Sequence, residues 1–238
     1  MNNKIVTAFD VDMQSISARL SEMGGIAEEQ LTQALEAVRT RDSELAEEVI
    51  RADDRLDQLE VKFEEMAIKT LALRQPVASD LREVVAAIKI ASTLERIGDL
   101  AKNIARRGKY LAETPPLRVS NSIVRMGRQT LTLFAEVLDA YTARDTALAV
   151  SVWNRDVEID DMHNSIFREL ITYMMEDPQL IGLCSQLLFI AKNLERIGDH
   201  STFIAEMTYF VVEGRPLGDN RPKGEPLGEL PTPGRRLG

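Results

Sequence analysis

The sequence has little of what builds β-rich, disulfide-linked or membrane-spanning proteins. Aromatic residues make up only 5% of its 238 residues, and there is one cysteine, Cys184. Few aromatic side chains disfavour sandwiches and barrels, whose strands depend on them, and a single thiol cannot form an internal disulfide. No 18 apolar residues follow one another, which predicts that no segment spans a membrane. The N-terminus also lacks the apolar core of a signal peptide, so we expect a cytoplasmic protein.

Positive charge is also in short supply. The chain has 29 Lys and Arg against 38 Asp and Glu, a formal net charge of −9. Because the acidic residues are spread along the chain, we expect no broad basic surface of the kind that binds DNA or RNA. The composition therefore predicts that the protein does not bind nucleic acid.

Proline is rare before residue 214, where it occurs only at positions 76, 115, 116 and 178. Between these breaks, apolar residues recur at steps of three and four, the spacing of one helix face. Two such stripes are Phe9, Met13, Ile16, Leu20, Met23 and Ala27, and then Val49, Ala52, Leu56, Leu59, Phe63 and Met66. The pattern predicts six long helices near residues 4–40, 43–75, 77–112, 118–143, 145–176 and 178–213.

A repeat divides the chain into two similar halves. The six letters Leu-Glu-Arg-Ile-Gly-Asp occur at 94–99 and again at 194–199. A weaker match pairs Asp53-x-x-x-Asp57 with Asp156-x-x-x-Asp160 at an offset of 103. The repeat predicts an all-α protein of two pseudo-symmetric antiparallel three-helix bundles, over residues 1–113 and 117–213. Residues 214–238 are rich in proline and glycine and poor in large apolar residues, so we expect them to be disordered.

Each half carries two pairs of carboxylates four residues apart, which places both members of a pair on one helix face. The pairs are Asp53 with Asp57, Glu95 with Asp99, Asp156 with Asp160, and Glu195 with Asp199. Two pairs that face each other would form an oxygen-rich pocket, suited to Mg²⁺, Ca²⁺, Mn²⁺ or iron. The alternative is that these are ordinary charged helix faces, neutralised by Arg96 and Arg196. The spacing alone leaves both interpretations open.

The duplicated motif resembles the PhoU family of accessory regulators of phosphate-specific transport. The residues that carry the resemblance are Glu95–Asp99 with Lys102–Ala105, and Glu195–His200 with Ile204–Glu206. The resemblance extends over about residues 4–212. It implies a cytoplasmic homodimer without enzymatic activity. It also implies action on a phosphate ABC transporter and a membrane sensor histidine kinase, which dampens uptake and the starvation response when phosphate is plentiful.

The resemblance further implies metal clusters of iron, zinc, magnesium or manganese, held by the paired acidic motifs. The corresponding residues here are Asp53, Asp57, Glu95 and Asp99, then Asp156, Asp160, Glu195 and Asp199. The family pattern often has Asn four residues after the motif Asp. Asn103 fits this pattern and is a candidate ligand, but Phe203 replaces it in the second half, so we expect the two sites to differ.

Two other functions fit the same helices. A metal-free scaffold would dock partner helices through exposed seams and make the acidic pairs incidental. A di-iron carboxylate oxidase requires Glu-x-x-His on two helices. Only Asp160-x-x-His163 partly matches that motif. In the first half, Glu60 occupies the position that corresponds to His163. We expect His163 to be a partly exposed helix residue, and His200 to have a structural role.

Overall fold

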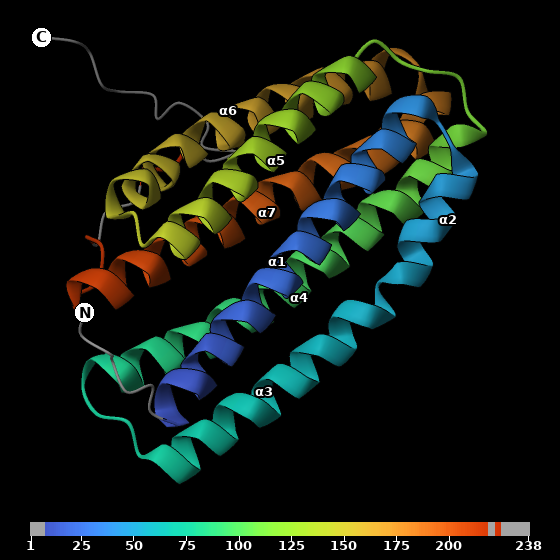
Figure 1. The fold of residues 1–238 in the computed structure, drawn as a ribbon. Coiled ribbons are helices and arrows are strands. Elements are labelled where there is room, and N and C mark those ends of the chain that lie inside the picture. Colours follow the sequence, from blue (N-terminus) through green and yellow to red (C-terminus); the bar gives the residue numbers. More distant parts are fainter. Residues whose placement is uncertain (1–7, 219–221, 225–238) are drawn as a thin grey trace, which may run out of the picture.

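The computed structural model describes residues 8–218 and 222–224, and the regular structure in these ranges is helical (Figure 1). The first half contains α1 (Ala8–Thr40), α2 (Ser43–Ala52), α3 (Asp54–Arg74) and α4 (Ser79–Ala112). The second half contains α5 (Ser120–Ala143), α6 (Thr146–Glu176), the short 3₁₀ helix η1 (Pro178–Leu180) and α7 (Ile181–Glu213). The predicted all-α fold is confirmed. Residues 4–7 of the first predicted helix lie outside the described residues.

The first turn of each half uses the same local signal. Asp42 accepts hydrogen bonds from the N–H groups of the residues two and three positions later, at 2.9 and 3.0 Å, and so caps α2. Asp145 caps α6 in the same way and at the same distances. Each aspartate follows an arginine with a positive φ, 61° at Arg41 and 53° at Arg144. These turns are 103 residues apart, the offset that also relates Asp53 to Asp156.

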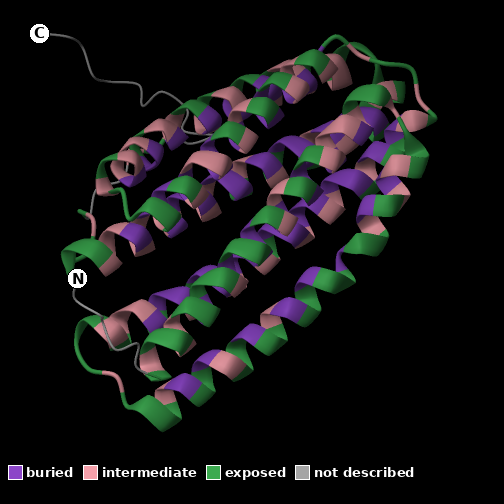
Figure 2. Cartoon of the chain, in the orientation of Figure 1, coloured by how far each residue is buried: buried purple, intermediate pink, exposed green. Residues whose placement is uncertain are grey.

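The helices form two bundles that lie side by side. One bundle contains α1, α4 and the α2–α3 pair, and the other contains α5, α6 and α7 (Figure 1). Helices α4 and α7, which carry the repeated motif, pack against each other between the bundles, and α1 also packs against α5. Gly127 allows the second contact, because a Cβ there would lie 2.4 Å from Leu35 Cδ2. Buried residues follow the inward face of each helix (Figure 2).

The second predicted helix is interrupted at Asp53. Helix α2 ends at Ala52 and α3 begins at Asp54, although the φ and ψ of Asp53, −61° and −38°, stay helical. The predicted burial of Ala52 was wrong, because Ala52 is exposed and Asp53 is only 1% exposed. The Asp53 side chain turns inward to reach Lys102 of α4, which shifts the buried face by one residue at this point.

The described part of the C-terminal segment lies against the helices. Leu217 packs against the core, and the Gly224 N–H donates to Asp160 Oδ2 at 3.0 Å. Residues 219–221 and 225–238 lie outside the described residues, and the disorder expected over 214–238 stays a prediction. Within the described ranges, no helix has both the length and the apolar character that crossing a bilayer requires.

Candidate functional site

The glycine of each repeated motif lets neighbouring side chains come close to the third helix, and in the second half that neighbour is an aspartate. A Cβ at Gly198 would lie 2.4 Å from Asp156 Oδ1, a distance that real Cβ atoms do not reach. A Cβ at Gly98 would lie 2.5 Å from Leu56 Cδ2 and 3.6 Å from Asp53 Oδ1. Both aspartates are 1% exposed. The two halves therefore each bring one buried carboxylate against the motif helix.

In the first half, Lys102 is the counter-charge of the acidic cluster. Its Nζ donates to Asp53 Oδ2 and lies 3.6 Å from Asp99 Oδ1. The hydrogen bond to Asp53 raises the pKa of Lys102 above its usual range. Asp57 lies at the exposed edge, and its pKa is raised by partial burial and by the negative charge of Asp53. One lysine thus provides positive charge to a group of several carboxylates.

Glu95 is the most perturbed carboxyl group of this cluster. Burial, followed by the charges of Asp99, Asp57, Glu60 and Asp53, raises the pKa of Glu95 to about 7. The four carboxylates predicted for the first half therefore share one electrostatic environment. Glu60 belongs to the same environment, although sequence reasoning noted it only as the counterpart of His163.

The raised pKa of Glu95 predicts how stability depends on pH in the chelator-treated protein. Between pH 4.5 and 7 the folded state keeps a proton on Glu95 that the unfolded state has lost, so this group makes stability fall as pH rises. After allowance for solvent screening, Glu95→Gln should be more stable than wild type by about 1–2 kcal/mol at pH 8, with little difference at pH 4. Urea denaturation at both pH values measures this, and an equal difference at both would contradict the raised pKa.

In the second half, Asp199, Glu195 and Asp160 form the corresponding cluster. Burial, then the charges of Glu195 and Asp160, raises the pKa of Asp199, and Lys223 and Lys192 oppose this shift. Lys192 Nζ lies 2.7 Å from Glu195 Oε2. Lysines therefore supply the positive charge here too, but from different positions than in the first half.

The prediction that His163 is partly exposed was wrong, because the residue is buried. It lies on the inward face of α6 with Ile159 and Ile166, which are four residues before it and three after it and are both buried. Burial lowers the pKa of His163, while Glu195 and Asp160 raise it. The imidazole therefore adds a nitrogen donor beside the second cluster. His200 lies elsewhere, where burial and the charges of Arg196 and Arg96 lower its pKa.

Three residues of the motif helices do not make the contacts that the sequence suggested for them. The Asn103 Oδ1 accepts a hydrogen bond from Arg106 Nη1 at 3.3 Å, so its amide is turned along α4. Arg96 and Arg196 are exposed, and neither forms a salt bridge to any described residue. Lysines, and not these arginines, contact the clustered carboxylates.

The donor set of each cluster suits a hard divalent cation, because carboxylate oxygens dominate it and positive charge is scarce. Within the described ranges, no three Asp, Glu, His or Cys side chains already converge in a way that would hold a metal ion. A cation would therefore require rotation of carboxylates at the cluster edge, such as Asp57 and Asp99. The carboxylate oxygens are therefore suitable metal ligands, but several of these side chains would have to rotate before they could bind one ion.

The PhoU domain matches this chain twice, over residues 20–108 and 123–208. The chain belongs to the PhoU family. Each matched stretch contains one acidic cluster, with Asp53 and Glu95 in the first and Asp156 and Glu195 in the second. The family suggested by the duplicated motif is thereby confirmed.

Relatives named as phosphate-specific transport system accessory proteins match almost the whole chain. The PhoU homolog of Caulobacter vibrioides is 46% identical over 230 residues, 96% of this chain and 100% of its own. That of Rhizobium meliloti is 45% identical over 222 residues, 93% of this chain and 94% of its own. The match therefore extends beyond the repeated motif to nearly the full length of these PhoU proteins.

Two solved PhoU structures share the fold. The crystal structure of PhoU from Pseudomonas aeruginosa has a TM-score of 0.85 and 38% identity, and covers 87% of this chain and all of its own. The PhoU regulatory protein of Streptococcus pneumoniae has a TM-score of 0.82 and 28% identity, and covers 88% of this chain and 99% of its own. The helical bundle architecture of this chain is therefore that of PhoU proteins.

Proposed function

We propose that this protein is a negative regulator of phosphate uptake and of phosphate-starvation signalling. The observation that carries the proposal is the pair of PhoU domains, in a chain that matches accessory proteins of phosphate-specific transport over nearly its full length. In this proposal the protein acts from the cytoplasm on the phosphate ABC transporter and its sensor histidine kinase. It works by binding these partners and has no catalytic role of its own.

We further propose that the two acidic clusters bind metal ions. The residues that would hold them are Asp53, Asp57, Glu95, Asp99 and Asn103 in the first half, and Asp156, Asp160, Glu195 and Asp199 in the second. Support comes from the burial of carboxyl groups and the crowding of carboxylates, which together raise the pKa of Glu95 and of Asp199. Mg²⁺, Mn²⁺, iron or Zn²⁺ would supply positive charge at positions where lysine ammonium groups now supply it.

The two metal sites should not be equivalent. The first cluster has Glu60 beside its carboxylates, so its donors are oxygen atoms, and the Asn103 amide would have to turn away from Arg106 to join them. The second has Phe203 in place of Asn103 and has the buried imidazole of His163 beside its carboxylates. A nitrogen donor favours zinc or iron over magnesium, so we expect the second site to be the more selective for transition metals.

The same proposal includes a homodimer, as the family resemblance implies. Sedimentation equilibrium should give a mass of about twice 26.6 kDa for the purified protein. A monomer mass at micromolar concentration would contradict the dimer without affecting the regulatory role.

Deleting the gene should raise phosphate uptake in phosphate-rich medium, because the transporter is no longer negatively regulated. Phosphate accumulation and alkaline phosphatase activity should both increase, and the wild-type gene should restore them. A complementing copy with Glu95→Gln and Asp99→Asn tests whether regulation depends on the first cluster. Unchanged accumulation and unchanged phosphatase activity in the deletion strain would contradict the regulatory role.

A further inference from the structure

A cavity of about 440 Å³ opens at the end of the molecule where the first turn and the loop between the bundles lie (upper right in Figure 1). Both bundles line it. The first contributes the end of α1 and Leu111 of α4, and the second contributes the start of α5 with Leu183 and Leu187 of α7. Pro115 and Pro116 of the connecting loop complete the wall. A molecule bound in this cavity would contact both bundles at once.

Four arginines line this cavity, namely Arg39, Arg41, Arg125 and Arg128. None of the described lining residues is Asp or Glu, in a chain with a formal net charge of −9. One guanidinium is compensated nearby, because Arg39 Nη2 lies 2.5 Å from Glu36 Oε1. The cavity therefore concentrates positive charge against the overall charge of the protein.

The other three arginines are not neutralised by a salt bridge in the described residues. Arg41 donates to the backbone carbonyl oxygens of Leu111 and Thr114, which are neutral acceptors and hold its guanidinium in place. Arg125 and Arg128 are exposed and lie three residues apart, on one face at the start of α5. Arg39 and, more weakly, the charge of Arg128 lower the pKa of Glu36, so Arg128 is partly compensated. Arg128 and Arg125 still have donors that no salt bridge within the described residues occupies.

The equivalent turn of the second half, at the opposite end of the molecule, has no comparable concentration of positive charge. Arg144, which occupies the same turn position as Arg41, forms a salt bridge with Glu83. The cavity beside Arg144 measures only about 40 Å³. The repeat thus produced two similar turns, but only the one at Arg41 borders a large cavity that several arginines line.

The shape and charge of the cavity point to one class of ligand. Guanidinium groups bind phosphate oxygens through paired hydrogen bonds, and several together suit a ligand with more than one phosphate group. The volume lies within the range of about 300–1,000 Å³ that is typical of small-molecule sites, and it is far larger than one phosphate ion. Aliphatic side chains, among them Ile123, Leu183 and Leu187, line the remaining wall.

We propose that this cavity binds a nucleoside polyphosphate, whose phosphate groups contact the arginines and whose nucleoside lies against the aliphatic wall. Because its walls come from both bundles, the bound ligand would couple their positions. This site is separate from the acidic clusters, and it does not depend on the proposed metal binding.

Calorimetric titration of the full chain with ATP tests the proposal. Chelator-treated protein and buffer without divalent cations exclude binding through a metal at the acidic clusters. We expect one site per chain, with affinity that falls as salt is raised. The double variant Arg125→Gln, Arg128→Gln should bind ATP at least about tenfold more weakly, because two charged donors are lost.

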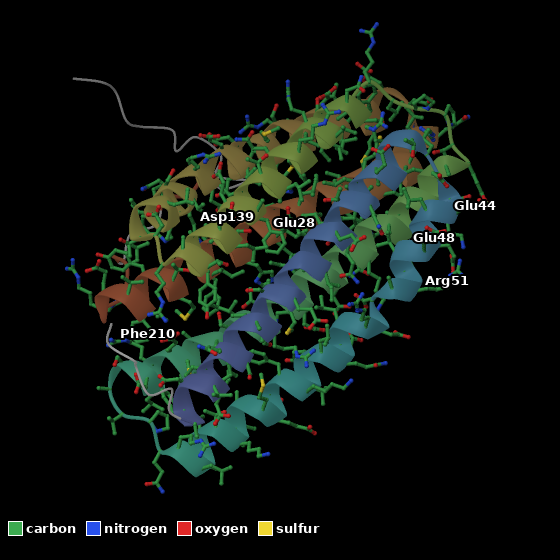
Figure 3. All side chains as sticks on the ribbon, viewed as in Figure 1. Glu28, Glu44, Glu48, Arg51, Asp139 and Phe210 are labelled. Carbon is green, nitrogen blue, oxygen red and sulfur yellow. The ribbon has the colours of Figure 1, made fainter. Side chains whose placement is uncertain are left out.

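The matched control is Arg51→Gln, Arg168→Gln, which changes the net charge equally. Arg51 points outward from α2 (Figure 3), and Arg168 is exposed on α6. This variant should bind ATP within about twofold of wild type, as expected for surface charges away from the site. Equal weakening in both variants, or no ATP binding up to about 1 mM, would overturn the proposal.

Two further measurements define the ligand and its place. ATP should bind more tightly than tripolyphosphate, and orthophosphate should bind most weakly, because only ATP uses the aliphatic wall. Equal affinity for ATP and tripolyphosphate would overturn the nucleoside part of the proposal. Photolabelling of wild-type protein with 8-azido-ATP should modify residues 38–41, 111–128 or 183–187, and labelling elsewhere would contradict the site.

Discussion

Gly198→Ala should lower the free energy of unfolding by about 2–3 kcal/mol, although alanine favours helices over glycine by about 1 kcal/mol. The new Cβ would lie 2.4 Å from Oδ1 of Asp156, a buried carboxylate. The two helices must separate or Asp156 must leave its position. Either change should also weaken the second acidic cluster. Urea denaturation measures the first effect, and isothermal titration with Mn²⁺ measures the second.

The matched control for Gly198→Ala is Gly25→Ala. Gly25 is exposed in the middle of α1, and a Cβ there would meet nothing within 4 Å. This substitution should therefore stabilise the protein by up to about 1 kcal/mol, through helix propensity and reduced entropy of the unfolded chain. If both alanine variants were equally stable, the close approach of Asp156 to α7 would be wrong.

Lys102→Met should be the most destabilising change among the charged residues, with a cost of about 2–4 kcal/mol. The substitution leaves Asp53, which is 1% exposed, without the ammonium group that contacts it. Removing one partner of a buried ion pair is costly because the remaining charge stays in a poorly solvated position. A divalent cation should restore part of the loss, since it binds only the folded state and replaces the missing charge.

Lys109→Met is the control on the same helix. Lys109 lies 2.7 Å from Glu47, but both side chains are exposed, and exposed ion pairs contribute little to stability. This variant should unfold close to wild type, with or without added cation. Equal unfolding midpoints for the Lys102→Met and Lys109→Met variants would show that Asp53 does not depend on its lysine.

The helices and the repeat could be predicted from the sequence because the residue patterns that mark them are local. Prolines and capping aspartates mark helix ends within a few residues, and apolar spacing marks the buried face. The inward turn of Asp53 was not accessible, because it depends on Lys102, which is 49 residues away in the sequence. The burial of His163 was accessible, since Ile159 and Ile166 share its helix face.

Part of the candidate site could likewise be predicted from the sequence, and part of it could not. Spacing and resemblance identified the four carboxylates that share one electrostatic environment in the first half, and Asp160, Glu195 and Asp199, which do so in the second. They did not identify the lysines that contact these carboxylates, nor the orientation of Asn103 toward Arg106. The arginine-lined cavity could not be predicted from the sequence, because Arg41 and Arg125 are 84 residues apart and line one cavity only when α1 packs against α5.

Thermal unfolding with and without a chelator tests whether the acidic clusters bind metal ions. Wild-type protein should lose stability on chelation and regain it with Mg²⁺, Mn²⁺, iron or Zn²⁺, because a ligand bound only to the folded state stabilises it. The double variant Glu95→Gln, Asp99→Asn should keep only the response of the second cluster. A wild-type melting curve unchanged by chelator and by each added metal would contradict the metal sites and favour a metal-free scaffold.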